Sequence, residues 1–168
     1  MTKDWTLRKR RPVRKKQIKP LLVALEQHLG IDLALDQAFL ELAEFGTWEM
    51  VLVDKVPIVL SIQESGEDKK VFLTLRGFLQ HLSAGRWVEV DHGAIPFLMN
   101  GADCMVAGIQ DVDSSVVAGD LVWIRDEVHK RPLAIGRALF NGHDLKTELK
   151  GKGIKTLHWV GDDLWALE

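Results

Sequence analysis

The chain has 168 residues, enough for one ordinary domain or two small ones, and it is 46% hydrophobic and 27% charged, as is typical of a globular protein. No apolar run reaches 18 residues and no apolar segment follows the charged N-terminus, so we expect neither a membrane span nor a signal peptide. Because Cys104 is the single cysteine, an internal disulfide and a cysteine-based zinc site are excluded, and we expect a cytoplasmic protein.

The formal net charge of −2 hides an asymmetry along the chain. Residues 1–19 hold nine basic residues and one acidic residue, whereas the rest of the chain holds 13 basic and 23 acidic residues. A basic arm on an acidic body predicts contact with nucleic acid or another polyanion. The alternatives are a solubilising tail and a segment that pairs with the chain's own acidic surface.

The first elements are an arm and two helices. Residues 1–16 contain few apolar residues, so we predict a flexible arm that becomes ordered only on contact, and deletion of this arm should leave the fold intact. A helix is predicted from Gln17, with Pro20 near its start and Gly30 at its end. Apolar residues at helical spacing predict a second helix over 33–45.

The apolar pattern then changes to that of strands. Strands are predicted at 48–53 and 58–62, joined by a hairpin, and a third strand is predicted at 71–73. Thr74 is a candidate N-cap for a short helix that runs through residue 82. The Ser-Ala-Gly sequence after this helix marks the domain boundary, so the first domain is expected to cover 17–85.

The second half is expected to be a domain of mostly short strands, covering 86–168. One short helix is predicted over 93–99, and the number and spacing of the strands favour a small barrel-like β domain. The fold class is therefore α+β, with a small α/β domain before a β-barrel-like domain. The predicted strands are 87–90, 104–109, 121–124, 133–140, 156–160 and 164–167.

Two stretches resemble the opening of a PUA domain, a family named after pseudouridine synthases and archaeosine transglycosylases. They are residues 90–95 (VDHGAI) and 100–109 (NGADCMVAGI). The family has a Gly-Ala turn into a short helix, a second Gly-Ala, and a strand that ends in Pro-Gly-Ile. Ala107 occupies the usual proline position, and because alanine can also adopt the φ near −65° that proline imposes, we expect the same fold.

The end of the chain resembles the malignant-T-cell-amplified-sequence proteins, which are close to the N-terminal part of ligatin and have archaeal relatives. The resemblance lies in residues 151–159 (GKGIKTLHW) and 163–165 (DLW). Residues 74–76 (TLR) also resemble the stretch that leads into the PUA part of that family, with Leu73 in place of the usual proline. The resemblance covers residues 71–168 and is compatible with a pre-PUA domain before them.

This resemblance implies a non-catalytic RNA-binding protein that acts in translation initiation or RNA modification. The implied RNA is tRNA or small-subunit ribosomal RNA, and the implied partners are the small ribosomal subunit and a protein with an initiation-factor-like domain. The alternative is an adaptor that docks a translation-factor partner through the pre-PUA domain, with RNA contact secondary. The basic arm favours the first hypothesis, whereas the acidic body favours the second.

The candidate RNA-binding residues form three groups. Arm cations can contact phosphates, the Gly-Ala turns lie where PUA domains form their RNA-facing groove, and three lysines flank the Gly151/Gly153 turn. Each glycine can instead serve only its turn, and the lysines can form a solvated loop. The candidates are Arg8, Lys9, Arg10, Arg11, Arg14, Lys15, Lys16, Gly93, Gly101, Ala102, Gly108, Lys150, Lys152 and Lys155.

A single substitution distinguishes these roles at Gly101. If Gly101 contacts RNA, Gly101→Val should weaken binding with little change in melting temperature, whereas a turn-only role predicts a loss of stability. Among the six tryptophans, Trp5 lies in the arm and is the candidate for stacking on a base or anchoring the arm. Trp87, Trp123, Trp159 and Trp165 are expected in the core.

No set of residues suited to catalysis is evident in the sequence. The chain contains no P-loop and no GxGxxG motif, and its six histidines are scattered. Asp91 and His92 have no paired nucleophile, and Cys104 lies in an apolar segment where a small core residue is expected. We therefore expect no enzymatic activity, no cofactor and no metal.

Overall fold

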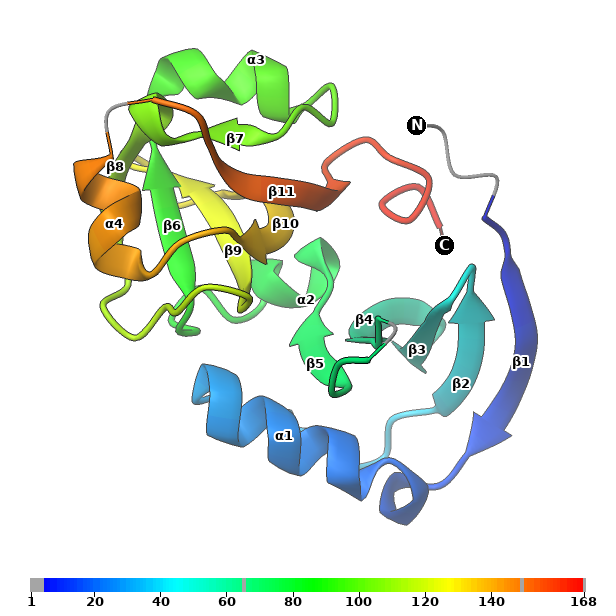
Figure 1. Cartoon of the computed structure of the whole chain (residues 1–168). Coiled ribbons are helices and arrows are strands. Elements are labelled where there is room, and N and C mark those ends of the chain that lie inside the picture. The colour runs from blue at the N-terminus through cyan, green and yellow to red at the C-terminus, as the bar shows by residue number, and fades with distance from the viewer. Residues whose placement is uncertain (1–4, 65, 149, 168) are drawn as a thin grey trace.

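The computed structural model describes residues 5–64, 66–148 and 150–167, which form two β-sheets joined by a short helix (Figure 1). The first sheet is an antiparallel meander of five strands in the order β1-β2-β3-β4-β5. Its strands are β1 (Leu7–Val13), β2 (Leu40–Phe45), β3 (Trp48–Val53), β4 (Val56–Ile62) and β5 (Lys70–Leu73). The helical segments of this half are η1 (Lys15–Gln17), α1 (Lys19–Leu29) and α2 (Leu75–Leu79).

The second sheet has six strands in the order β7-β11-β10-β9-β6-β8, with one parallel pair between β6 and β9. Its strands are β6 (Trp87–Val90), β7 (Cys104–Met105), β8 (Ile109–Val112), β9 (Leu121–Asp126), β10 (Pro132–Ala138) and β11 (Lys152–Trp159). The helical segments of this half are η2 (His92–Ala94), α3 (Ile95–Leu98), η3 (Val106–Gly108) and α4 (Gly142–Thr147). A mixed helix-and-strand fold is confirmed, while barrel closure and the boundary near residue 85 stay predictions.

Several local signals in the sequence correspond to observed turns and caps. Helix α1 ends at Gly30, which adopts the left-handed conformation with φ of 72°. Asp54 and Lys55 form the turn between β3 and β4 with φ of 48° and 72°, the conformation that matches the twist of a tight hairpin. Thr74 caps α2 by accepting a hydrogen bond from the Gly77 amide, so this prediction is also confirmed.

The predicted helix over 33–45 is wrong, because its second half is strand β2. Gln37 has φ of 65°, a left-handed conformation that cannot continue a right-handed helix. From Leu40 to Phe45 the backbone pairs with β1 on one side and β3 on the other. Cross-strand pairing therefore overrides a helical spacing that was only local.

The predicted flexible arm is also wrong for the described part of residues 1–16, because Leu7–Val13 forms edge strand β1 against β2. Two carboxylates on β2 stabilise this basic strand. Arg10 makes a two-point contact with Glu41 at 2.7 and 2.9 Å, and Glu44 lies 3.6 Å from the side-chain nitrogens of both Arg8 and Lys9. Deletion of residues 1–16 would therefore remove a strand, and we expect this deletion to destabilise the fold.

Three further differences concern the second half. Residues 164–166 form a turn and Leu167 is not in a strand, and Leu164 is buried in the core cluster that consists mainly of residues from the first half. The predicted strand over 104–109 is interrupted by η3, so β7 and β8 lie at opposite edges of the sheet. Helix α4 was not predicted, since its six residues provide less than two full turns of apolar periodicity.

The two sheets are held together by the stretches that carry the family resemblance. Buried His158 on β11 accepts a hydrogen bond at Nε2 from the Leu75 amide, over 3.3 Å, and its Nδ1 lies 2.8 Å from an Asp162 carboxylate oxygen. Arg76 donates to the Trp165 carbonyl over 3.0 Å, and its guanidinium lies 3.8 Å from the Trp165 ring centroid. The C-terminal turn is thereby fixed against the start of α2.

Candidate functional site

A cleft of about 950 Å³ separates the end of the first sheet from β11 and the C-terminal turn. Three of the candidate RNA-binding residues line it together, Gly101, Ala102 and Lys155, and so does Trp5, the candidate for stacking or anchoring. The site residues that the sequence did not indicate are Phe45, Trp48, Asn100, Asp103 and Thr156. Phe45 and Trp48 carry no local motif, since strand pairing brings them to the cleft, whereas Asn100, Asp103 and Thr156 lie within the stretches that carry the family resemblance.

Aromatic side chains form one wall of this cleft. The Trp5 ring meets the Phe45 ring edge to face at a centroid distance of 5.7 Å and the Trp48 ring at 5.0 Å. Trp5 also lies so close to Gly46 that a Cβ there would overlap its ring. The tight β2–β3 turn therefore holds Trp5 in place, which fits the prediction that this residue anchors the basic segment.

The facing wall is the loop after α3, which is tied to β11. Gly101 has φ of 81°, and a Cβ at this position would lie 2.7 Å from the Trp159 ring. Thr156 donates its hydroxyl to the Ala102 carbonyl over 2.8 Å, and its amide donates to Asp103 over 3.0 Å. Gly101 therefore has a structural reason to be glycine whether or not it contacts a ligand.

The cleft offers few positive charges to a phosphate. Lys155 is the one cation among its described lining residues, against four carboxylates from Glu64, Asp103, Asp162 and Asp163. Three of these carboxylates have partners: Glu64 pairs with Arg137 at 3.1 Å, Asp103 pairs with Lys152 at 3.1 Å, and Asp162 accepts backbone hydrogen bonds. Aromatic surface and polar acceptors suit a nucleobase or a peptide better than a phosphate.

The positive charges instead follow β1, which leads away from Trp5 at the cleft wall toward α1 (Figure 1). Arg8, Lys9 and Arg10 are paired with β2 carboxylates, and Lys15 lies 3.4 Å from Asp36. The hydrogen bond from Arg10 to Glu41 raises the pKa of Arg10 and lowers that of Glu41. Within the described ranges, Arg11, Arg14 and Lys16 are exposed and make no ion pair.

The remaining glycine candidates lie together outside the cleft. The Asp91 amide donates to the Gly108 carbonyl over 3.0 Å, and a Cβ at Gly108 would lie 3.3 Å from the Cβ of Ala94. Gly93 belongs to the same turn, where the Asp91 side chain caps η2 through the Ala94 amide. Lys150 and Lys152 are exposed at the start of β11 and do not line the cleft.

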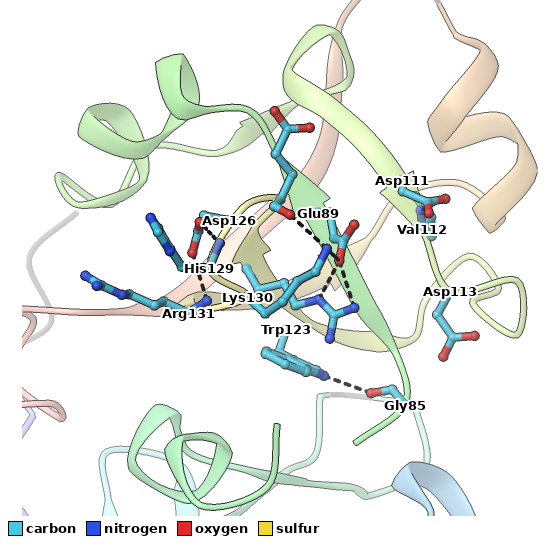
Figure 2. Close-up of polar contacts among 12 residues, drawn as sticks. Gly85, Glu89, Asp111, Val112, Asp113, Trp123, Asp126, His129, Lys130 and Arg131 are labelled. Atoms are coloured by element: carbon cyan, nitrogen blue, oxygen red, sulfur yellow. Dashed lines mark hydrogen bonds and ion pairs between the residues drawn. The ribbon is translucent and has the colours of Figure 1, made fainter. Parts of the chain in front are cut away.

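A separate polar network joins β6 to β9 (Figure 2). The largely buried Glu89 carboxylate is 2.8 Å from Arg125 and 2.6 Å from Lys130. Asp126 accepts backbone hydrogen bonds from His129 and Arg131. Burial by itself raises the pKa of Asp126, but these hydrogen bonds outweigh it, so the pKa is lowered. These carboxylates all have partners, so we assign the network to stabilising the β9–β10 hairpin.

The described residues contain no group of three or more His, Cys, Asp or Glu side chains that could hold a metal ion. Burial raises the pKa of the Cys104 thiol to about 12, so the thiolate needed of a nucleophile is scarce at neutral pH. No helix in the part of the chain that the structure describes is long and apolar enough to cross a membrane.

Comparison with known proteins identifies the second half. The PUA domain family model matches residues 86–160. An uncharacterized protein of Methanocaldococcus jannaschii is 41% identical over 161 residues, which cover 95% of this chain and 96% of that protein. A crystal structure of a hypothetical Pyrococcus horikoshii protein superposes with a TM-score of 0.77 at 30% identity, covering 93% of this chain and 97% of the other.

Eukaryotic relatives match over a shorter region. Translation machinery-associated protein 20 of Eremothecium gossypii is 34% identical over 98 residues, 55% of this chain and 54% of that protein. The Malignant T-cell-amplified sequence 1 homolog of Drosophila melanogaster is 32% identical over 80 residues, 46% of this chain and 44% of the other. The chain therefore aligns with about half the length of these two proteins.

Proposed function

Because the chain belongs to the family of PUA-domain proteins related to Translation machinery-associated protein 20 and the malignant-T-cell-amplified-sequence proteins, we propose that it is a non-catalytic RNA-binding protein of translation. Its RNA is tRNA or small-subunit ribosomal RNA, and it acts in the cytoplasm at the small ribosomal subunit during initiation, or in RNA modification. The names of the eukaryotic relatives support the translational setting.

One observation carries this proposal: the cleft and the basic strand meet at Trp5. An unpaired base enters the aromatic cleft, where the half-buried rings of Trp5 and Trp159 offer surface for stacking and Lys155 lies at the wall. The phosphates of the same RNA strand follow β1 toward Arg11, Arg14 and Lys16. Strand β1 has seven residues with an irregularity between Arg8 and Arg11, so it spans at most roughly 23 Å, enough to follow several successive phosphates.

Neutralising two unpaired cations should flatten the salt dependence of tRNA binding. Each phosphate contact that is lost lowers the magnitude of the slope of log affinity against log salt by about 0.7 to 0.9. Arg14→Gln with Lys16→Gln should therefore lower the magnitude of this slope by about 1.5. Affinity should fall for all RNAs alike, because phosphate contacts carry no sequence information. The measurement is a fluorescence anisotropy titration with tRNA at several salt concentrations.

The matched control neutralises two exposed cations in the second half of the chain, Arg131→Gln with Lys146→Gln; Arg131 has no ion pair within the described ranges, and Lys146 lies 3.4 Å from Asp111. This control should keep the wild-type slope. For the wild type we expect a slope of about −2 to −3, because β2 carboxylates already neutralise the other cations of β1. Equal slopes for both double variants would mean that the basic strand does not contact phosphate.

The adaptor hypothesis is favoured by a different observation. The carboxylates of the cleft outnumber its one described lysine, and Phe39 in the first half of the chain is 46% exposed. Acidic groups together with exposed aromatic surface suit a basic protein segment, such as one from an initiation-factor-like partner. Under this hypothesis the wild type should bind tRNA weakly at physiological salt.

A further inference from the structure

A second, smaller cavity of about 270 Å³ lies at the β2–β3 turn. Glu44, Glu49 and Ser61 are register partners across three neighbouring strands, so their side chains lie on the same face of the sheet. Together with Thr47, Gln63 and Lys69 they line the cavity. None of these six residues was among the candidates from the sequence, and all of them carry polar side chains.

The floor of this cavity contains a polar group without a partner. Ser61 is 4% exposed, and its hydroxyl oxygen makes no hydrogen bond with any described residue. A buried hydroxyl without a hydrogen bond is unfavourable, so a bound atom that donates to it or accepts from it stabilises the protein. This unsatisfied group distinguishes the cavity from an ordinary patch of surface charge.

The cavity wall places an acceptor next to a donor. The Lys69 ammonium nitrogen lies 3.7 Å from a Glu49 carboxylate oxygen, and the two side chains are 48% and 39% exposed. A carboxylate accepts two parallel hydrogen bonds, whereas an ammonium only donates. A ligand that fits this pair presents two adjacent N–H donors with an acceptor beside them.

Among the four RNA bases, guanine alone has such an edge, with N1–H and the 2-amino group next to O6. Adenine and cytosine place an unprotonated ring nitrogen beside the amino group, where it would face the carboxylate. Uracil has one N–H between two carbonyl oxygens. We propose that this cavity is a subsite for an unpaired guanine, with Glu49 accepting from N1–H and the 2-amino group and Lys69 donating to O6.

This inference rests on the proposed RNA binding and specifies which base is selected. Glu44 lines the cavity and also lies 3.6 Å from the side-chain nitrogens of Arg8 and Lys9, so the basic strand borders the site. The two glutamates inside disfavour a phosphate there, so the base enters the cavity and the phosphate stays outside.

Nucleoside titrations test the subsite without any phosphate contact. Guanosine should shift the backbone amide NMR signals of Glu49, Ser61 and Lys69 in the full chain, and adenosine should not. Inosine, which lacks the 2-amino group, should bind about tenfold more weakly, as should guanosine to Glu49→Gln. Glu26→Gln, which removes an exposed carboxylate on α1, should bind guanosine as the wild type does.

The outcomes separate this inference from the proposed function. If guanosine and adenosine cause equal shifts, or if Glu49→Gln binds guanosine unchanged, the guanine subsite is overturned even when tRNA still binds. If tRNA does not bind but guanosine binds selectively, the proposed function fails and the cavity is a nucleoside site. A melting temperature for Glu49→Gln that equals that of Glu26→Gln excludes misfolding as the cause of weakened binding.

Discussion

Trp123→Ala should lower the free energy of unfolding by about 3 to 5 kcal/mol, the range typical for removing a buried aromatic side chain. Trp123 is 0% exposed and belongs to the second sheet, yet its ring stacks on Phe78 of α2 at 4.8 Å and 14°. Its indole N–H donates to the Gly85 carbonyl over 2.9 Å (Figure 2). One side chain therefore packs the two halves of the chain against each other.

The measurement is denaturant unfolding followed by circular dichroism. Trp123→Phe is the matched comparison, because it keeps an aromatic ring opposite Phe78 but leaves the Gly85 carbonyl without its partner. We expect it to cost about 1 to 3 kcal/mol, the range for an unsatisfied buried group. A decrease below about 1 kcal/mol for Trp123→Ala would show that this ring does not join the two halves, since removing a buried aromatic side chain usually costs about 3 kcal/mol or more.

Gly101→Val should destabilise the protein by about 2 to 6 kcal/mol, because backbone strain and overpacking each cost about 1 to 3 kcal/mol. The residue has φ of 81°, which a β-branched side chain adopts only under strain. A Cβ would also approach the Trp159 ring to 2.7 Å. The structure therefore favours a decrease in stability over the alternative of weakened RNA binding at unchanged stability.

Gly93→Ala provides the control for this substitution. Gly93 has no positive φ, and a Cβ there would lie an ordinary 3.4 Å from the nearest atom of Asp91. Its melting temperature should remain near the wild-type value. If Gly101→Val also melted at the wild-type temperature, the contact between the loop and Trp159 would be less rigid than described, and a role for Gly101 in binding would regain support.

The second half of the fold was more predictable from sequence than the first. Residues 90–95 and 100–109 combine glycines, a capping aspartate and short apolar runs, so local chemistry and family resemblance indicate the same elements. In the first half, β2 has apolar residues at a spacing that also fits a helix. Its pairing with β1 joins segments about 30 residues apart and is accompanied by ion pairs, for which the sequence gives no local signal.

The candidate site was also predictable from the sequence only in part. Gly101, Ala102 and Lys155 do meet in one cleft, because the motif that suggested them also fixes the fold there. The arm was correctly identified as basic, but charge counting could not show that Glu41 and Glu44 neutralise three of its residues. The aromatic wall was missed because Trp5 and Trp48 meet only after the first sheet has formed.

Backbone amide chemical shifts of the full chain, measured with and without tRNA, can locate the RNA contacts residue by residue. We expect tRNA to shift the signals of two regions: the cleft residues Ala102 and Lys155, and the basic segment from Arg11 to Lys16. The signals of Glu89 and Lys130, in the paired network on β6 and the β9–β10 hairpin, should stay unchanged. Shifts confined to that network, with none in the cleft or the basic segment, would contradict RNA binding at the cleft and β1.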